Sequence, residues 1–195
     1  MTDMEPEDII QNPEEIFAEH ANGWYEKSTG YWAQQDRTVA GMLGGFPEVS
    51  GVDLLQSRDL VEGLIDKKKL GTQRVADIGS GIGRVAYYVL SDYFQEIVLV
   101  EPIREFLPVA AEKLGNSVIH HEIVAGAQEW IPEGKFDAIW VQWVLMYLTD
   151  NDALSFLRRC KQALTQKGAV FIKDNIGKKN KEAPRDEAAY FKEDN

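Results

Sequence analysis

The stretch ADIGSGIGRV, residues 76–85, decides the fold of this chain of 195 residues. It follows a short apolar run typical of a β-strand and leads into a helical pattern. Gly79, Gly81 and Gly83 permit a tight turn and a close approach of the backbone to a ligand, and the next helix offers free N–H groups. A strand, a glycine-rich turn and a helix in this order indicate a nucleotide-binding α/β unit.

Strand and helix patterns alternate on both sides of this loop. A helix is expected from residue 51 to the lysines at 67–69, and later helices are expected at 83–94, 104–115 and 152–166. Short apolar strands are expected at 74–79, 96–102, 117–125, 136–143 and 168–175. For the last helix, Thr149 or Asp150 is the expected N-cap and Gly168 follows its end. The alternation predicts an α/β fold with a doubly wound, mainly parallel sheet.

The chain is expected to form two parts. Residues 1–50 are polar and aromatic, and they predict an N-terminal helical extension that ends in a glycine-rich substrate loop, GMLGGF at 41–46. Residues 51–195 form the α/β core. The polar stretch after residue 175 supplies no further strand, so we expect an apolar strand at the sheet edge. Either the natural chain is longer, or the tail covers that edge.

The composition of the chain excludes several kinds of binding partner. A formal net charge of −11 argues against direct binding to nucleic acid or to an anionic membrane, and it suits a basic partner. No apolar run is long enough to cross a bilayer, which predicts a cytoplasmic or nuclear protein. Cys160 falls on the apolar side of a helical pattern and is expected in the core. His120 and His121 belong to no metal-ligand set, so we expect no metal.

Three details of the glycine loop predict its ligand. Arg84 stands where a dinucleotide-binding loop has its third glycine, which disfavours NAD and FAD. Asp77 would repel a pyrophosphate and favour a cation, and Glu101 ends the next strand, where a carboxylate can bind both ribose hydroxyls. Taken singly, Asp77 could cap a helix and Glu101 could be a surface carboxylate. Together they favour S-adenosylmethionine, a sulfonium nucleoside without phosphates. Ala127 and Gln128, after the third strand, could contact its adenine.

The sequence resembles one methyltransferase family, the α-N-terminal protein methyltransferases, which methylate the free α-amine of proteins that begin X-Pro-Lys. The resemblance covers roughly residues 20–175, and it is specific because it includes motifs outside the glycine loop. These motifs are YW at 31–32, TVAGMLGGF at 38–46, GSGIGR at 79–84, WVQWVLMYLTD at 140–150, FLRRCK at 156–161 and IKDN at 172–175. The resemblance implies a class I methyltransferase fold that binds S-adenosylmethionine.

The resemblance also implies the residues of the site. Cofactor contacts are expected from Asp77, Gly79, Gly81, Gly83, Arg84, Glu101, Pro102, Ala127, Gln128 and Gln142. Contacts to the substrate's N-terminal residues are expected from Trp32, Leu43, Gly44, Gly45, Trp143, Asp174 and Asn175. The flat indoles of Trp32 and Trp143 suit a proline ring, and acidic groups near the mouth would hold the lysine.

The expected catalytic residues are Tyr147, Asn175 and Asp194. The chain reads Met146-Tyr147 where the family typically has Gly-His, and the histidine is a proposed proton acceptor. A tyrosine, with an ordinary pKa of about 10, is a poor base at neutral pH but can position the amine. Asp194 aligns with a second proposed base.

Three alternative functions are compatible with these sequence features. The first is methylation of X-Pro-Lys N-termini by a monomeric enzyme. The second is a weak or inactive methyltransferase-like module that binds peptides, because Tyr147 replaces the family histidine. The third is a small-molecule methyltransferase, for which Trp32 and Trp143 would be coincidental.

Overall fold

The sheet has five parallel strands in the order β3-β2-β1-β4-β5. The computed structural model describes residues 23–175, so the chain before Gly23 and the tail after Asn175 lie outside the described residues. The strands are β1 (Arg74–Ile78), β2 (Glu96–Val100), β3 (Ile119–Ile123), β4 (Phe136–Gln142) and β5 (Leu164–Lys173). The prediction of a doubly wound parallel sheet is confirmed, and β5 lies at an edge of the described sheet.

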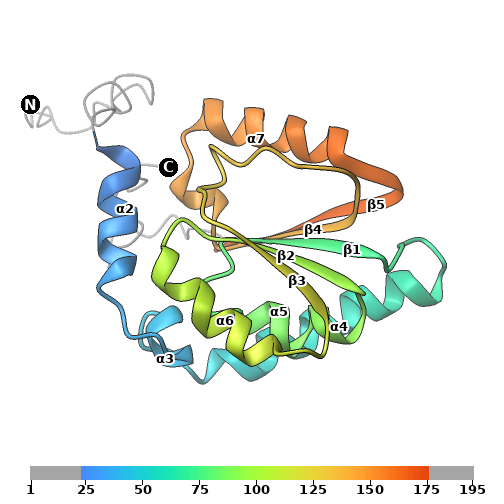
Figure 1. Cartoon of the computed structure of the whole chain (residues 1–195), viewed down its shortest axis with the longest axis horizontal. Coiled ribbons are helices and arrows are strands. Elements are labelled where there is room, and N and C mark those ends of the chain that lie inside the picture. The colour runs from blue at the N-terminus through green and yellow to red at the C-terminus, as the bar shows by residue number, and fades with distance from the viewer. Residues whose placement is uncertain (1–22, 176–195) are drawn as a thin grey trace, which may run out of the picture.

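Helices cover both faces of this sheet (Figure 1). Helices α4 (Val49–Asp66), α5 (Arg84–Tyr88) and α6 (Leu107–Leu114) lie on one face, and α7 (Asp150–Ala163) lies on the other. Helices α2 (Trp24–Ala33) and α3 (Val39–Met42) lie beside the end of the sheet where the strands finish. Three short 3-10 helices complete the fold: η1 (Leu90–Asp92), η2 (Arg104–Phe106) and η3 (Leu145–Tyr147).

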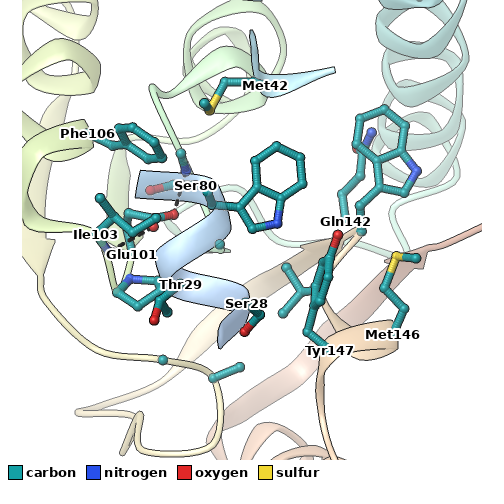
Figure 2. Close-up of a pocket in the computed structure, with 18 of the residues that line it drawn as sticks. Ser28, Thr29, Met42, Ser80, Glu101, Ile103, Phe106, Gln142, Met146 and Tyr147 are labelled. Carbon is teal, nitrogen blue, oxygen red and sulfur yellow. Dashed lines mark hydrogen bonds between the residues drawn. The ribbon is translucent and has the colours of Figure 1, made fainter. Parts of the chain in front are cut away.

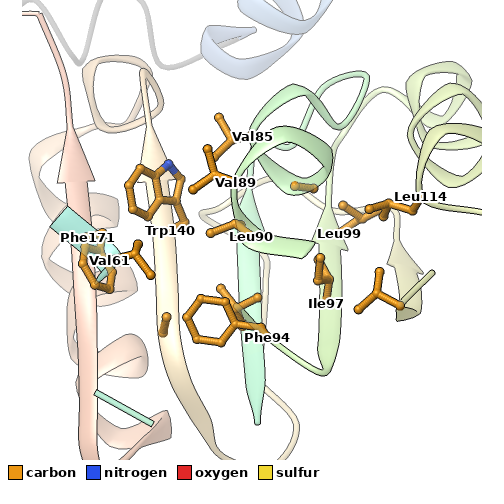
Figure 3. Close-up of a cluster of buried hydrophobic side chains, with 14 of the residues drawn as sticks. Val61, Val85, Val89, Leu90, Phe94, Ile97, Leu99, Leu114, Trp140 and Phe171 are labelled. Carbon is orange, nitrogen blue, oxygen red and sulfur yellow. The ribbon is translucent and has the colours of Figure 1, made fainter. Parts of the chain in front are cut away.

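Each face of the sheet buries its own hydrophobic cluster. Figure 3 shows the cluster under α4 and α5, in which Val61 and Leu90 pack with Trp140 and Phe171. On the opposite face, the cluster under α7 includes Cys160, which is fully buried as expected. Burial raises the pKa of the Cys160 thiol to about 12, so this side chain is an inert core residue.

The largest differences from the expected ranges concern α5, α7 and β5. The helix expected at 83–94 is interrupted: α5 ends at Tyr88 and η1 follows it. The last helix begins after Thr149, whose hydroxyl caps it by accepting from the Asp152 N–H as predicted, but it ends at Ala163. Gly168 therefore lies inside β5 and not past a helix end. An added Cβ there would meet the Phe136 carbonyl oxygen at 2.7 Å, and the register between β4 and β5 shifts at this point.

Within residues 23–175 no helix has the length and apolar content needed to cross a membrane. In the same range, no group of three or more histidine, cysteine, aspartate or glutamate side chains is arranged to hold a metal ion.

Candidate active site

A cavity of about 770 Å³ opens at the carboxyl ends of the strands (Figure 2). This is where ligands bind in open parallel sheets. The glycine loop, the end of β2, the end of β4 at Gln142 and the segment after β3 form its inner wall. Helix α2, the loop after α3 and residues 143–148 form its outer wall. Of the expected site residues, fifteen line it: Trp32, Leu43, Gly44, Asp77, Gly79, Gly81, Arg84, Glu101, Pro102, Ala127, Gln128, Gln142, Trp143, Tyr147 and Asn175.

The three glycines of the loop at 79–83 have different structural roles. Gly79, Gly81 and Gly83 all have positive φ, between 52° and 71°. A Cβ at Gly79 would lie 2.4 Å from the Val144 side chain, so only glycine lets the loop after β4 approach the cavity floor. A Cβ at Gly83 would lie 2.7 Å from the Ala110 Cβ, and Gly83 does not line the cavity. Gly83 therefore serves the packing of α5 against α6.

Glu101 ties the end of β2 to the glycine loop. Its carboxylate accepts hydrogen bonds from the Gly81 N–H at 2.8 Å and from the Ile103 N–H at 2.9 Å. Burial raises the pKa of Glu101 to about 7, although the two N–H groups act in the opposite direction. Glu101, expected at the ribose, is thus a buried carboxyl at the end of β2 that also holds the glycine loop in place.

Asp77 lies on the cavity floor at the end of β1. It is 3% exposed, and its Oδ2 has no hydrogen-bond partner among the described residues. The Ser80 Oγ, three residues further along the loop and in the same wall, is also buried and without a hydrogen-bond partner among the described residues. Burial raises the pKa of Asp77 to about 7, and the nearby Arg84 guanidinium opposes this shift. A buried oxygen without a hydrogen-bond partner costs free energy, so a ligand that donates a hydrogen bond to this wall would bind favourably.

The segment after β3 is held by a residue that sequence reasoning missed. Arg159 of α7 donates to the carbonyl oxygens of Ala127 at 2.9 Å, Gln128 at 3.0 Å and Trp130 at 2.9 Å. These bonds fix the backbone that carries the expected adenine contacts. The position of Arg159 within FLRRCK gave no signal that its side chain reaches this loop.

The end of β4 turns sharply at Trp143. This residue has φ +56°, a left-handed conformation that is uncommon for a bulky side chain. Its N–H donates to the Lys173 carbonyl oxygen at 2.7 Å, and the Arg84 guanidinium carbon lies 5.4 Å from the centroid of its ring. Just before it, Gln142 directs its amide at Asp53 and accepts from the Trp140 indole at 3.0 Å.

Helix α2 brings a second group of aromatic side chains to the cavity. The Trp32 ring lies 6.4 Å from the Tyr147 ring in an edge-to-face arrangement. The indole N–H of Trp24, a residue that is 2% exposed, donates to the Tyr147 carbonyl oxygen at 2.8 Å. Figure 2 shows Ser28 and Thr29 of α2 between Glu101 and Tyr147 in this view, and both residues line the cavity. Helix α2 and η3 are therefore fixed to each other, and the aromatic pair spans the outer wall.

Other expected residues lie at the rim or outside the cavity. Gly44 lines it, whereas Gly45 does not. Asn175 lines it and is exposed, and the Asp174 carboxylate accepts from the Met146 N–H at 3.2 Å without lining it. Asp194 lies outside the described residues.

Sequence reasoning also missed several lining side chains. They include Ser28, Thr29, Met42, Phe46, Ser80, Ile82, Ile103, Phe106 and Met146. Figure 2 shows Phe106 and Ile103 on the side of Glu101, and Met146 beyond Tyr147 on the other side. Ile103 and Phe106 follow the acidic end of β2, and that position is the signal that could have found them.

The cavity fits S-adenosylmethionine. Gly79 and Gly81 leave room above the backbone, Glu101 offers a carboxylate at the end of β2, and Asp77 and Ser80 present unpartnered oxygens. Arg84 is a cation in this wall and is 5% exposed. Its guanidinium can pair with the carboxylate at the amino-acid end of the cofactor.

Comparisons with known proteins agree with this geometry. A family model described as AdoMet dependent proline di-methyltransferase matches residues 20–192. The N-terminal Xaa-Pro-Lys N-methyltransferase 1 of Mus musculus is 38% identical over 158 residues, which are 78% of this chain and 71% of the relative. The Danio rerio protein of the same name is 33% identical over 168 residues, 84% of this chain and 75% of the relative.

Solved structures give the same result. A SAM-dependent methyltransferase from Leishmania major superimposes with a TM-score of 0.77 and 32% identity, over 85% of this chain and 70% of the other. A Haemonchus contortus phosphoethanolamine N-methyltransferase, at 19% identity, covers 84% of this chain and 33% of the other with a TM-score of 0.61, and it shows the shared fold alone.

Fold and cavity together define a class I methyltransferase that depends on S-adenosylmethionine. Within this class, the chain belongs to the AdoMet-dependent proline di-methyltransferase family.

Proposed function

We propose that this protein methylates the α-amino group of proteins that begin X-Pro-Lys. The observation that carries the proposal is that one cavity is lined both by the glycine loop and by Trp32, Trp143 and Tyr147. A proline ring packs well against indole faces, whereas a free α-amine must reach the inner wall where the cofactor binds. The relatives from mouse and zebrafish, which carry the name N-terminal Xaa-Pro-Lys N-methyltransferase 1, support this substrate.

The inner wall holds the cofactor in this proposal. Glu101 accepts from the ribose hydroxyls, Arg84 pairs with the carboxylate, and Asp77 receives a donor from the amino-acid end. Ala127 and Gln128 contact the adenine. When bound, S-adenosylmethionine supplies a methyl group from its sulfonium. The chain divides accordingly into a helical extension with a substrate loop at 1–50 and a cofactor-binding core at 51–195.

The outer wall holds the peptide. Trp32 and Trp143 enclose the first two residues, Leu43 and Gly44 cover them, and Asn175 at the rim accepts or donates to the peptide backbone. Entry of a bound peptide into a water-poor aromatic channel favours an uncharged nitrogen. The net charge of −11 favours the lysine at the third position.

Little base catalysis is needed for this reaction. An α-amine has a pKa of about 7.7–8.0, compared with about 10.4 for a lysine side chain, so much of it is neutral at slightly alkaline pH. This difference corresponds to roughly 3.4 kcal/mol in favour of the α-amine. Tyr147 therefore acts as a positioning group that aligns the nitrogen, and alignment supplies most of the rate. The proton lost by the α-amine passes to solvent through the cavity mouth.

Mass spectrometry of a peptide time course tests this function. The protein is incubated with S-adenosylmethionine and Ser-Pro-Lys-Arg at pH 7, 8 and 9, and an N-acetylated copy of the peptide is the control. We expect stepwise gain of methyl groups on the free peptide alone, faster at pH 8 than at pH 7 as the amine loses its proton. Peptide binding without mass gain would indicate an inactive module, and transfer only to small amines would indicate the small-molecule function.

The remaining expectations form part of the same proposal. We propose a monomer that acts in the cytoplasm or the nucleus on basic protein N-termini, without direct contact to nucleic acid or membrane. The acidic composition supports this choice of partner.

A further inference from the structure

A buried polar cluster lies directly behind the cavity wall, centred on Asp53 of α4. Asp53 is 8% exposed, and its Oδ2 receives Arg84 Nη2 at 2.7 Å. Both of its carboxylate oxygens lie 2.9 Å from Gln142 Nε2. Lys173 also donates to this carboxylate, and to the Ser57 hydroxyl at 2.8 Å. Helix α5 and strands β4 and β5 thus converge on one side chain of α4.

The charges in this cluster show how firmly it is held. Burial alone would raise the pKa of Asp53, but hydrogen bonds from Lys173, Gln142 and Arg84 outweigh it and hold the pKa below its ordinary value. The carboxylate is therefore ionised at neutral pH. The Arg84 side chain is 6% exposed and depends on this anion, because a buried guanidinium without a partner is strongly unfavourable.

Asp53 reaches the substrate wall through two of its partners. The Arg84 guanidinium carbon lies 5.4 Å from the Trp143 ring centroid, within the range of a cation–π contact. The Trp143 N–H donates to the carbonyl oxygen of Lys173, the other cation bound to Asp53, and this bond holds the unusual φ of +56°. Both the indole and the backbone of Trp143 therefore depend on groups that Asp53 fixes.

We propose that Asp53 is a positioning residue that keeps the inner wall (the cofactor wall) and the outer wall (the peptide wall) in one relative geometry. It does not line the cavity, so it acts through Arg84 on the cofactor side and through Trp143 on the peptide side. The peptide part of this inference rests on the proposed function, whereas the cofactor part needs only the family membership. Because a misplacement of about 1 Å can reduce a rate by about 100-fold, one such anchor can control turnover.

Asp53→Asn tests this inference, because asparagine has the same shape but no charge. We expect the Kd for S-adenosylhomocysteine, measured by calorimetry without peptide, to rise about 10-fold, as for one lost charged hydrogen bond. We expect kcat/KM for Ser-Pro-Lys-Arg to fall about 100-fold. Asp59→Asn is the matched control, since Asp59 is an exposed carboxylate on the same helix, and both constants should stay within about twofold there.

A second variant separates positioning from simple charge balance. Asp53→Asn with Lys173→Met removes one anion and one cation, so the cluster keeps its net charge while Arg84 loses its anchor. We expect this variant to recover thermal stability relative to Asp53→Asn alone, but not cofactor affinity or kcat/KM. Recovery of affinity together with stability would show that Asp53 only balances charge and would overturn the proposal. So would an Asp53→Asn protein in which both constants remain at the wild-type values.

The two measurements, the Kd for S-adenosylhomocysteine and kcat/KM for the peptide, also distinguish this inference from the proposed function. If the wild-type protein fails to methylate Ser-Pro-Lys-Arg, the proposed substrate is wrong. The Kd measured by calorimetry still decides whether Asp53 positions Arg84 for the cofactor, because that experiment uses S-adenosylhomocysteine without peptide.

Discussion

The two walls of the cavity are built in opposite ways. The inner wall, which we propose binds the cofactor, consists of backbone and buried carboxyls from neighbouring strand ends, with the Gly81 N–H bound to Glu101. The outer wall, which we propose binds the peptide, consists of partly buried aromatic side chains from segments far apart in the sequence. The bond that fixes it, from the Trp24 indole to the Tyr147 carbonyl oxygen, joins residues 123 positions apart.

This difference predicts different responses to substitution. The cofactor wall depends on buried charged groups and on positive φ angles, where small chemical changes leave polar atoms unpartnered. The peptide wall depends on contact area between rings, which is lost in proportion to the atoms removed. Substitutions in the cofactor wall should therefore have large effects, and substitutions in the peptide wall should have smaller effects that scale with the contact area lost.

The largest effect is expected from Glu101→Gln. The new amide keeps one acceptor oxygen, so its NH2 group would face either the Gly81 or the Ile103 N–H, and the ribose would be offered one acceptor oxygen fewer. We expect the Kd for S-adenosylhomocysteine, measured by calorimetry, to rise about 100-fold, since hydrogen bonds to a charged group contribute about 1.5–3 kcal/mol each. Glu105→Gln, at an exposed position on η2, should bind normally. Equal affinity in both variants would contradict the role of Glu101.

Trp32→Ala should have the next largest effect, and on the other wall only. Loss of the ring removes its contact with Tyr147 and one face for the proline, so kcat/KM for Ser-Pro-Lys-Arg should fall about 20-fold. The Kd for S-adenosylhomocysteine should change by less than about threefold, since Trp32 belongs to the outer wall. Tyr88→Ala removes an exposed ring on α5 and serves as the control. An equal loss of cofactor affinity in Trp32→Ala would show that the two walls are not separate.

Tyr147→His should change the rate moderately, in the direction of a gain. The bond from Trp24 goes to the backbone carbonyl of residue 147 and survives the substitution. An imidazole has an ordinary pKa of about 6.5 and can accept the amine proton at neutral pH, so kcat at pH 7 should rise about fivefold and the gain should shrink at pH 9. Unchanged kinetics at both pH values would rule out that residue 147 lies beside the reacting amine.

The smallest expected effect is a pH dependence of cofactor binding. Burial raises the pKa of both Asp77 and Glu101 to about 7, so the free protein holds protons that the unfolded chain releases near pH 4. The stability from these two groups is present at low pH and is lost as pH rises through about 7. A ligand that donates hydrogen bonds to them favours the ionised forms and releases protons.

Cofactor affinity should therefore rise about threefold between pH 6 and pH 8. Calorimetry in two buffers of different ionisation enthalpy measures the protons released, and the release should diminish in Glu101→Gln. Proton uptake on binding at pH 6 would contradict the raised pKa values.

The sequence predicted that the glycine loop and the acidic end of the next strand lie together, because these signals are local. The loop at 76–85 and the carboxylate at Glu101 lie within one β-α-β unit, and their positions follow from strand order alone. Helix boundaries were less predictable: Gly168 looked like a helix terminator, but close contact with the Phe136 carbonyl makes it a strand glycine. Sequence periodicity does not contain that contact.

The peptide wall and Asp53 show what sequence patterns omit. Trp32 and Trp143 were identified only by resemblance, because their presence in one cavity depends on tertiary packing. Asp53 was missed because a lone aspartate on a helix is usually exposed. Its partners Arg84, Gln142 and Lys173 are 31, 89 and 120 positions away. The available signal was that Asp53 and Ser57 share the buried stripe of α4 with Val61.

The measurement that tests the central claim most directly is the position of the methyl group in the product. Ser-Pro-Lys-Arg and Ser-Ala-Lys-Arg are offered in equal amounts to the wild-type protein with S-adenosylmethionine, and the products are fragmented by tandem mass spectrometry. The structure predicts methylation on the α-nitrogen of the proline-containing peptide, with little on its alanine counterpart. Methylation of the lysine side chain, or equal use of the two peptides, would contradict an aromatic channel built for an X-Pro terminus.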